Sequence, residues 1–104
     1  MLDTRLTGGK LSPNEERIVT LDGVPSFAHG AVVNLTVTET EGAGYVAVFP
    51  AGSTWPGNSS VNWSGPDENV ANAVLTGTDA NGRVAIRGGV NRAQVVIDLV
   101  GYLL

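Results

Sequence analysis

The stretch AVVNLTVTE (residues 31–39) decides the fold class of this chain. Its apolar residues recur at every second position, and strict alternation is typical of a half-buried β-strand. One face carries Ala31, Val33, Leu35 and Val37, and the other carries Val32, Asn34, Thr36 and Thr38. Further short strands are predicted at RIVTL (17–21), GYVAVFP (44–50), SVNWS (60–64), NVANAVLTG (69–77) and, after the turn in TDANGRVAIRG (78–88), at Val84 and Ile86.

The two ends of the chain complete this series of strands. The final stretch AQVVIDLVGYLL (93–104) is almost continuously apolar, which indicates a strand covered on both faces. The first stretch, MLDTRL (1–6), is expected to pair at an edge or beside that last strand. One helical turn at most is predicted, where Ser12-Pro13-Asn14-Glu15 has the pattern of a helix start without an amphipathic run behind it.

Turn signals predict how the strands are joined. TEGAG (40–44) is expected to form a hairpin-like link, and Asn81-Gly82 is the strongest short hairpin signal in the chain. With no helical crossovers, we predict one all-β domain over residues 1–104. Its expected architecture is an antiparallel β-sandwich of about seven to eight strands, immunoglobulin-like or jelly-roll.

Composition excludes several classes of function. The net charge of −4 and the absence of any Lys/Arg cluster argue against a nucleic-acid partner. The chain has no cysteine, so neither a disulfide framework nor a thiolate nucleophile can form. No apolar run is long enough for a membrane span, and the N-terminus does not have the pattern of a secretory signal. If Met1 is the natural start, we expect synthesis in the cytoplasm without export.

Catalytic and metal-binding patterns are weak. His29 is the only histidine. No Gly-x-Ser-x-Gly nucleophile motif accompanies it and the chain has no Cys, so a loop or strand-edge role is expected. DANG (79–82) has part of a calcium-loop pattern, but the closing glutamate is missing and a turn explains every residue. We therefore expect no catalytic residue, no cofactor and no metal site.

Four polar residues lie inside otherwise apolar strands: Asn34, Asn62, Asn72 and Asp98. Buried polar groups are almost always hydrogen-bonded, so structural bonds to neighbouring backbone are favoured over ligand binding. If the first and last strands are neighbours, we expect Asp98 to meet Arg5.

Both tryptophans lie in AGSTWPGNSSVNWS (51–64). Exposed aromatic rings stack on sugars or anchor protein interfaces. Trp63 continues the alternation of Val61, so a core position is favoured for it. Trp55 precedes Pro56 and either pins its loop or is exposed. Trp55, and with less support Trp63, are therefore the candidate contact residues.

An ordered set of motifs spans nearly the whole chain: LDTR (2–5), VVNLTVTE (32–39), GYVAVFPAG (44–52), NVANAVLTG (69–77) and VVIDLVGYL (95–103). Pro56, NSSVNW (58–63) and GRVAI (82–86) lie between these motifs. The whole order resembles a β-sandwich module of actinobacterial exported proteins. The resemblance implies a non-catalytic domain that acts at a surface, in adhesion or polymer contact. Residues that match its pattern are interpreted as scaffold: Asp3, Thr4, Arg5, Asn34, Asn62, Asn72, Asp98 and Tyr102.

The context of this module leads to the functional hypothesis. A single exported-type module without an export signal is expected in a virion component, which is made in the host cytoplasm and acts outside it. We therefore expect a capsid decoration or tail protein of an actinobacterial phage. Its expected partners are other protein subunits, either those of the capsid or copies of itself, and a closed trimer is one assembly of the second kind. The alternative is a secreted or cell-surface module that binds carbohydrate or cell wall through Trp55 and Trp63.

Overall fold

The chain folds entirely from β-strands. In a computed structural model, which describes residues 2–104, eight strands and no helix are present. The strands are β1 (Leu2–Asp3), β2 (Glu16–Thr20), β3 (Gly30–Thr38), β4 (Gly44–Pro50), β5 (Val61–Trp63), β6 (Val70–Thr76), β7 (Arg83–Gly88) and β8 (Gln94–Leu103). The predicted all-β class and the predicted positions of the strands are confirmed, including the pairing of the first residues with the last strand, where Leu2 lies opposite Ile97.

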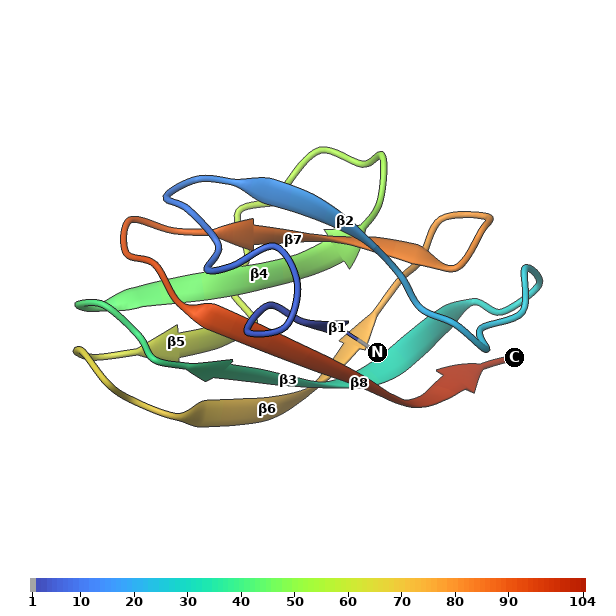
Figure 1. Cartoon of the computed structure of the whole chain (residues 1–104). Coiled ribbons are helices and arrows are strands. Elements are labelled where there is room, and N and C mark those ends of the chain that lie inside the picture. The colour runs from blue at the N-terminus through green and yellow to red at the C-terminus, as the bar shows by residue number, and fades with distance from the viewer. Residues whose placement is uncertain (1) are drawn as a thin grey trace.

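The strands form two four-stranded antiparallel sheets (Figure 1), with orders β1-β8-β3-β6 and β2-β7-β4-β5. The pairs β1–β8, β2–β7, β3–β6 and β4–β5 are nested, as if one long hairpin had been wrapped around the core. This nesting is the jelly-roll arrangement rather than the immunoglobulin one, in which A, B, E and D form one sheet and C, F and G the other.

The core lies between the two sheets and follows from the alternation in the sequence. All four apolar residues of one β3 face, Ala31, Val33, Leu35 and Val37, are fully buried. They pack with inward-facing residues of the other strands: Val46, Val48, Val61, Val84, Ile86, Val95 and Ile97. Since burying one Val, Leu or Ile side chain contributes about 1.5–3 kcal/mol, this set is the main source of stability.

The link at TEGAG is not a hairpin. β3 pairs with β6 and β8, whereas β4 lies in the other sheet and pairs with β5 and β7. The physical reason is that both strands have a buried apolar face, and two such faces are covered best when the strands pack face to face. The connection is held by backbone hydrogen bonds instead, such as Glu41 N to Arg92 O at 2.9 Å.

The Asn81-Gly82 turn also differs from its prediction. It connects β6 to β7, which lie in different sheets. Gly82 has φ of 71°, but Asn81 is not among the described residues with positive φ, so the turn that favours tight hairpins is not formed. The turn is instead held by the side chain of Asp79, which accepts hydrogen bonds from the N–H groups of Asn81 and Arg83.

β8 is covered on one face only, contrary to the prediction from its apolar sequence. Val95 and Ile97 are buried, but Asp98 and Val100 are exposed on the outer side. The pairing of β3 with β8 shifts register between Val32 and Val33, and Val100 is the extra residue at this bulge. No element of residues 2–104 packs over it, so the C-terminal half of β8 presents apolar side chains to solvent.

The predicted helical turn is a single non-helical turn. Asn14 has φ of 58°, which a right-handed helix does not allow. The Glu15 carboxylate nevertheless accepts a hydrogen bond from the Ser12 N–H at 2.8 Å, as the helix-start pattern would predict.

Candidate functional site

The two tryptophans lie on opposite faces of one sheet. Trp63 follows the inward alternation of β5, lies opposite Gly44 and is only 6% exposed. Its ring lies against the Gly44 backbone, and the indole Nε1 is buried without a hydrogen-bond partner among the described residues. Trp63 is thus a core residue, which the alternation favoured, and its ring does not reach the surface.

Trp55 lies over the outer face of the same sheet. It packs on a small buried cluster formed by Ala47, Phe49 and Ala85. Its ring stacks on Tyr45, with 6.0 Å between centroids and 13° between planes, and the Arg87 guanidinium carbon lies 4.5 Å from its ring. Because the sheet separates Trp55 from Trp63, the two rings do not form a single stacking platform.

The loop that carries Trp55 is pinned from both sides. The indole Nε1 donates a hydrogen bond to the Asn58 carbonyl oxygen at 3.0 Å. Arg87, which contacts the ring, is held by an ion pair of 2.6 Å with Glu16 on the neighbouring strand. Of the two expectations for Trp55, loop pinning therefore has clear geometric support.

The expected contact between Arg5 and Asp98 is not formed. Arg5 instead bonds back to Asp3, with its Nε 2.9 Å from Oδ1 and its Nη2 2.7 Å from Oδ2. This hydrogen bonding from the Arg5 side chain lowers the pKa of Asp3 below its ordinary value. Two residues of separation are enough for a turn to bring the pair together, so the local partner prevails over the distant one.

The polar residues inside the strands are not buried, contrary to the expectation. Asn34 and Asp98 lie directly opposite each other on the outer face of their sheet, and Asn62 is exposed on β5. Only Asn72 forms the predicted kind of bond, since its Nδ2 donates to the Ser60 carbonyl oxygen at 3.0 Å. That bond connects β6 to the entrance of β5 and so ties the two sheets together.

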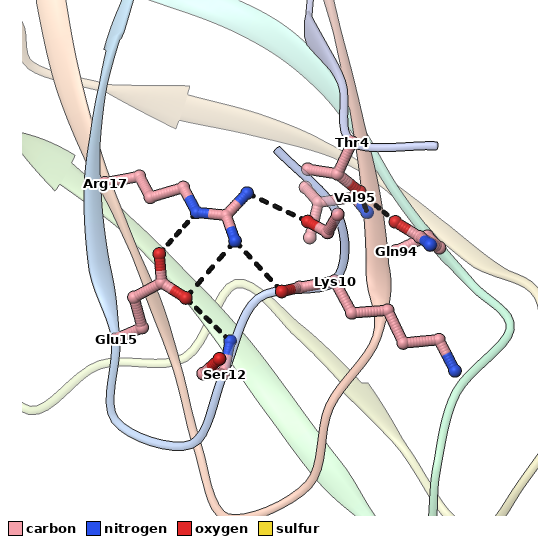
Figure 2. A network of polar contacts seen from close by, with 8 residues as sticks. Thr4, Lys10, Ser12, Glu15, Arg17, Gln94 and Val95 are labelled. Carbon is pink, nitrogen blue, oxygen red and sulfur yellow. Dashed lines mark hydrogen bonds and ion pairs between the residues drawn. The ribbon is translucent and has the colours of Figure 1, made fainter. Parts of the chain in front are cut away.

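The LDTR segment at the start of the chain has its structural role at Thr4, which is buried. Its hydroxyl donates to Gln94 Oε1 at 2.6 Å and accepts from the Val95 N–H at 2.7 Å (Figure 2). The scaffold interpretation of Thr4 agrees with this geometry.

A second network holds the segment that follows. Arg17 donates through Nη1 to the Gly9 carbonyl and through Nη2 to the Lys10 carbonyl, each at 2.9 Å, and through Nε to Glu15 (Figure 2). The hydrogen bond from Arg17 is the main reason that the pKa of Glu15 is lowered from its ordinary 4.5. Arg17 thus fixes the turns between β1 and β2.

The DANG turn uses its carboxylate oxygens internally. Burial alone would raise the pKa of Asp79, but hydrogen bonds from the backbone and side chain of Arg83 and from the Asn81 N–H bring it below the ordinary value. Among residues 2–104, no group of three or more His, Cys, Asp and Glu side chains is placed to hold a metal ion. His29 is exposed in the loop before β3, where its backbone N–H donates to the Leu103 carbonyl oxygen.

No pocket is found on the described part of the molecule. It also contains no helix long and apolar enough to cross a membrane.

An apolar surface that the sequence analysis missed lies at one end of the sheet β1-β8-β3-β6. Large exposed apolar side chains number nine in the described chain, and six of them gather here, a set we call the C-terminal patch: Phe27, Leu75, Val100, Tyr102, Leu103 and Leu104. They come from the end of β6, the end of β8 and the loop before β3.

Strand pairing places Leu75, Val100 and Leu103 around the start of β3, whereas Tyr102 lies opposite the buried Ala31 and so starts from the inner face of the sheet. Val32 lies opposite both Leu75 and Gly101, and the Leu103 carbonyl oxygen accepts a hydrogen bond from the backbone N–H of His29, two residues after Phe27. The end of β8 and the loop before β3 lie at the same end of the molecule (Figure 1). The signal in the sequence was the excess of apolar residues in 93–104. That excess predicts cover on both faces, whereas Val100, Leu103 and Leu104 are exposed to solvent.

Comparison with known proteins gives no further assignment: no family model, no curated protein and no solved structure matches this chain.

Proposed function

We propose that this chain is a non-enzymatic structural and interaction module, and most specifically a capsid decoration or tail protein on the virion of an actinobacterial phage. The observation that carries the proposal is the C-terminal patch. Large exposed apolar patches on soluble domains mark surfaces that bind other proteins. The patch is formed by the ends of β6 and β8 and by the loop before β3, so segments distant in sequence can contact one partner together.

The jelly-roll topology supports the proposal by analogy. Jelly rolls occur in viral capsid domains and also in lectins, so the topology raises the weight of both the virion and the carbohydrate hypotheses. The separation of Trp55 from Trp63 by a sheet weakens the carbohydrate alternative, because that alternative relied on the two rings as a stacking pair. The protein-binding hypothesis therefore has the better support.

The C-terminal patch can be sufficient for docking if the chain binds at many equivalent sites of a shell. A shell offers many equivalent sites. If several linked copies of the chain bind to it, each binding event after the first is effectively intramolecular, so the total affinity rises although no single interface becomes stronger. The exposed apolar side chains supply the affinity, and the acidic character of the chain, with a net charge of −4, keeps the remaining surface hydrated.

A matched pair of substitutions tests the proposal. Val100 in the patch is 67% exposed and Val90, outside it, is 71% exposed, so Val100→Glu and Val90→Glu change the same residue type at equal exposure. Shells are prepared from a phage that encodes the chain and stripped of it, and each purified variant is co-sedimented with them. Val100→Glu is expected to weaken binding at least about tenfold, since it puts a charge into a desolvated contact, and Val90→Glu is expected to bind as the wild type does.

The stability of both variants is measured in parallel by urea denaturation, and a change within about 0.5 kcal/mol is expected because both positions are exposed. Equal binding by both variants would show that the patch is not the docking surface. Failure of the wild-type chain to bind the shells would contradict the proposed function itself.

A further inference from the structure

The sandwich has four edge strands, and three of them are protected against pairing with another chain. β1 has two residues and β5 has three, which is too short to template a neighbour. β2 is longer but carries Glu16 and Arg17, which take part in ion pairs with Arg87 and Glu15. Short edges and charged edges are the usual protection of sheet proteins against edge-to-edge association.

The fourth edge, β6, has none of these protections. Its seven residues, Val70–Thr76, include no charge and no proline. Its register with β3 runs without a shift from Val70 to Thr76, so no bulge twists the edge away. Ala71, Ala73 and Leu75 are exposed on its outer side. The backbone groups of β6 that point away from β3 therefore form an uncharged row, not interrupted by a bulge, that can bond to another strand.

We propose that β6 pairs with the β6 strand of a second copy of this chain, antiparallel and centred on Ala73, so that two sheets join into one continuous sheet. In this register Ala73 lies opposite the partner's Ala73, and Ala71 lies opposite the partner's Leu75. A small residue thus faces a large one on the outer side, which is how cross-strand pairs fill space. The two-fold arrangement also closes the assembly at two chains.

A second copy fits this edge better than a charged peptide does. The strand carries no charge that could recognise an acidic or basic partner, while self-pairing of an uncharged strand places no like charges opposite each other even though each chain has a net charge of −4. Leu75 belongs to both β6 and the C-terminal patch, so pairing extends that patch across two chains. The inference goes beyond the proposed function and does not depend on it.

The first test is the concentration dependence of the molar mass of the full chain, measured by sedimentation equilibrium. A dimer is expected for the wild type. Ala73→Lys puts two lysines opposite each other at the two-fold axis and is expected to raise the dissociation constant at least about tenfold. Ile18→Lys, on the exposed face of the charged edge β2, is the control and is expected to leave the dimer unchanged.

Charge reversal then tests the register. An equal mixture of Ala73→Lys and Ala73→Glu places opposite charges across the axis, and it is expected to restore dimers that neither variant forms alone. A monomer or a trimer of the wild type overturns the proposal, and so does a dimer that Ala73→Lys does not weaken. Circular dichroism of each variant separates loss of pairing from loss of fold.

Disulfide cross-linking gives an independent test of the proposed β6–β6 register, because the chain has no cysteine of its own. Directly opposite residues of an antiparallel pair have Cα atoms about 4.5–5.5 Å apart, which lies within the range a disulfide spans. Ala73→Cys is expected to cross-link under mild oxidation. Ala71→Cys alone is not, since four residues of strand, roughly 13 Å, separate it from its copy.

A mixture of Ala71→Cys and Leu75→Cys chains is expected to cross-link, since the proposed register makes these two positions partners. Cross-linking of Ala71→Cys with itself, or none at Ala73→Cys, contradicts the register. If the wild-type chain bound shells but remained monomeric, the pairing would be wrong while the proposed function stood.

Discussion

At the scale of single residues, glycines in strands show where the core leaves no space. A Cβ added to Gly44 would lie 2.5 Å from Cζ2 of the Trp63 ring, closer than real contacts allow. The ring is buried against the opposite sheet and cannot move away. A Cβ added to Gly101, a glycine of β8 without positive φ, would meet no heavy atom within 4 Å.

This contrast gives a stability prediction. Gly44→Ala is expected to destabilise the fold by about 1–3 kcal/mol, the usual cost of overpacking a core. Gly101→Ala is expected to be neutral or stabilising by up to about 1 kcal/mol, because it removes only freedom of the unfolded chain. Urea denaturation followed by tryptophan fluorescence measures both, and equal midpoints for the two variants would show that Trp63 is not fixed as described.

At the scale of elements, the Arg17 network makes the turns between β1 and β2 dependent on pH. The folded-state pKa of Glu15 is lowered from 4.5, chiefly by the hydrogen bond from Arg17. Its contribution to stability is therefore complete above the unfolded-state pKa and is lost as pH falls through the lower folded-state value. Asp3, Glu41 and Asp79 are shifted in the same direction, so they act with the same sign.

The wild-type chain is expected to be less stable at about pH 3 than at about pH 6. Arg17→Met removes the main cause of the lowered Glu15 pKa, so this variant is expected to start less stable near neutral pH and to lose less stability on acidification. Urea midpoints of both chains at the two pH values measure the difference. An equal loss in both would mean that Arg17 does not hold the Glu15 carboxylate in solution.

The positions of the strands could be predicted from the sequence, but the connections between them could not. Alternation in residues such as Val33, Leu35 and Val37 defines which face is buried, so strand positions were predicted well. The connections between strands were not predicted correctly. TEGAG and Asn81-Gly82 contain residues typical of hairpin turns, but these residues do not determine which sheet the next strand enters. That choice depends on covering every apolar face at once, which is a property of the whole chain.

The candidate site was predicted less well than the strands, for a related reason. Trp55 stood out by its chemistry, but its contacts with Tyr45 and Arg87 depend on strand neighbours that only the topology brings together. Val100 and Leu75 carry no distinctive chemistry, and apolar residues in strands are ordinarily buried. Their exposure follows from the position of β6 at an edge and from the bulge in β8. No local sequence pattern predicts either feature.

At the scale of the whole molecule, two surfaces remain unused by the fold: the C-terminal patch and the β6 edge. They meet at Leu75, so one assembly can use both, with pairs of chains joined through β6 and docked through the patch. The nested jelly-roll pairing places the ends of β6 and β8 beside the start of β3, and this is why residues distant in sequence form one patch.

The proposal that this chain is a component of a virion surface is tested most directly by peptide mass spectrometry of purified virions. Virions of the phage that encodes the chain are purified by density gradient, and the peptides of residues 1–104 are quantified against the major capsid and tail proteins. The predicted result is the chain in a fixed stoichiometric ratio to one of them. Its absence from virions, together with its recovery from the cell envelope or the culture medium, would contradict the proposal.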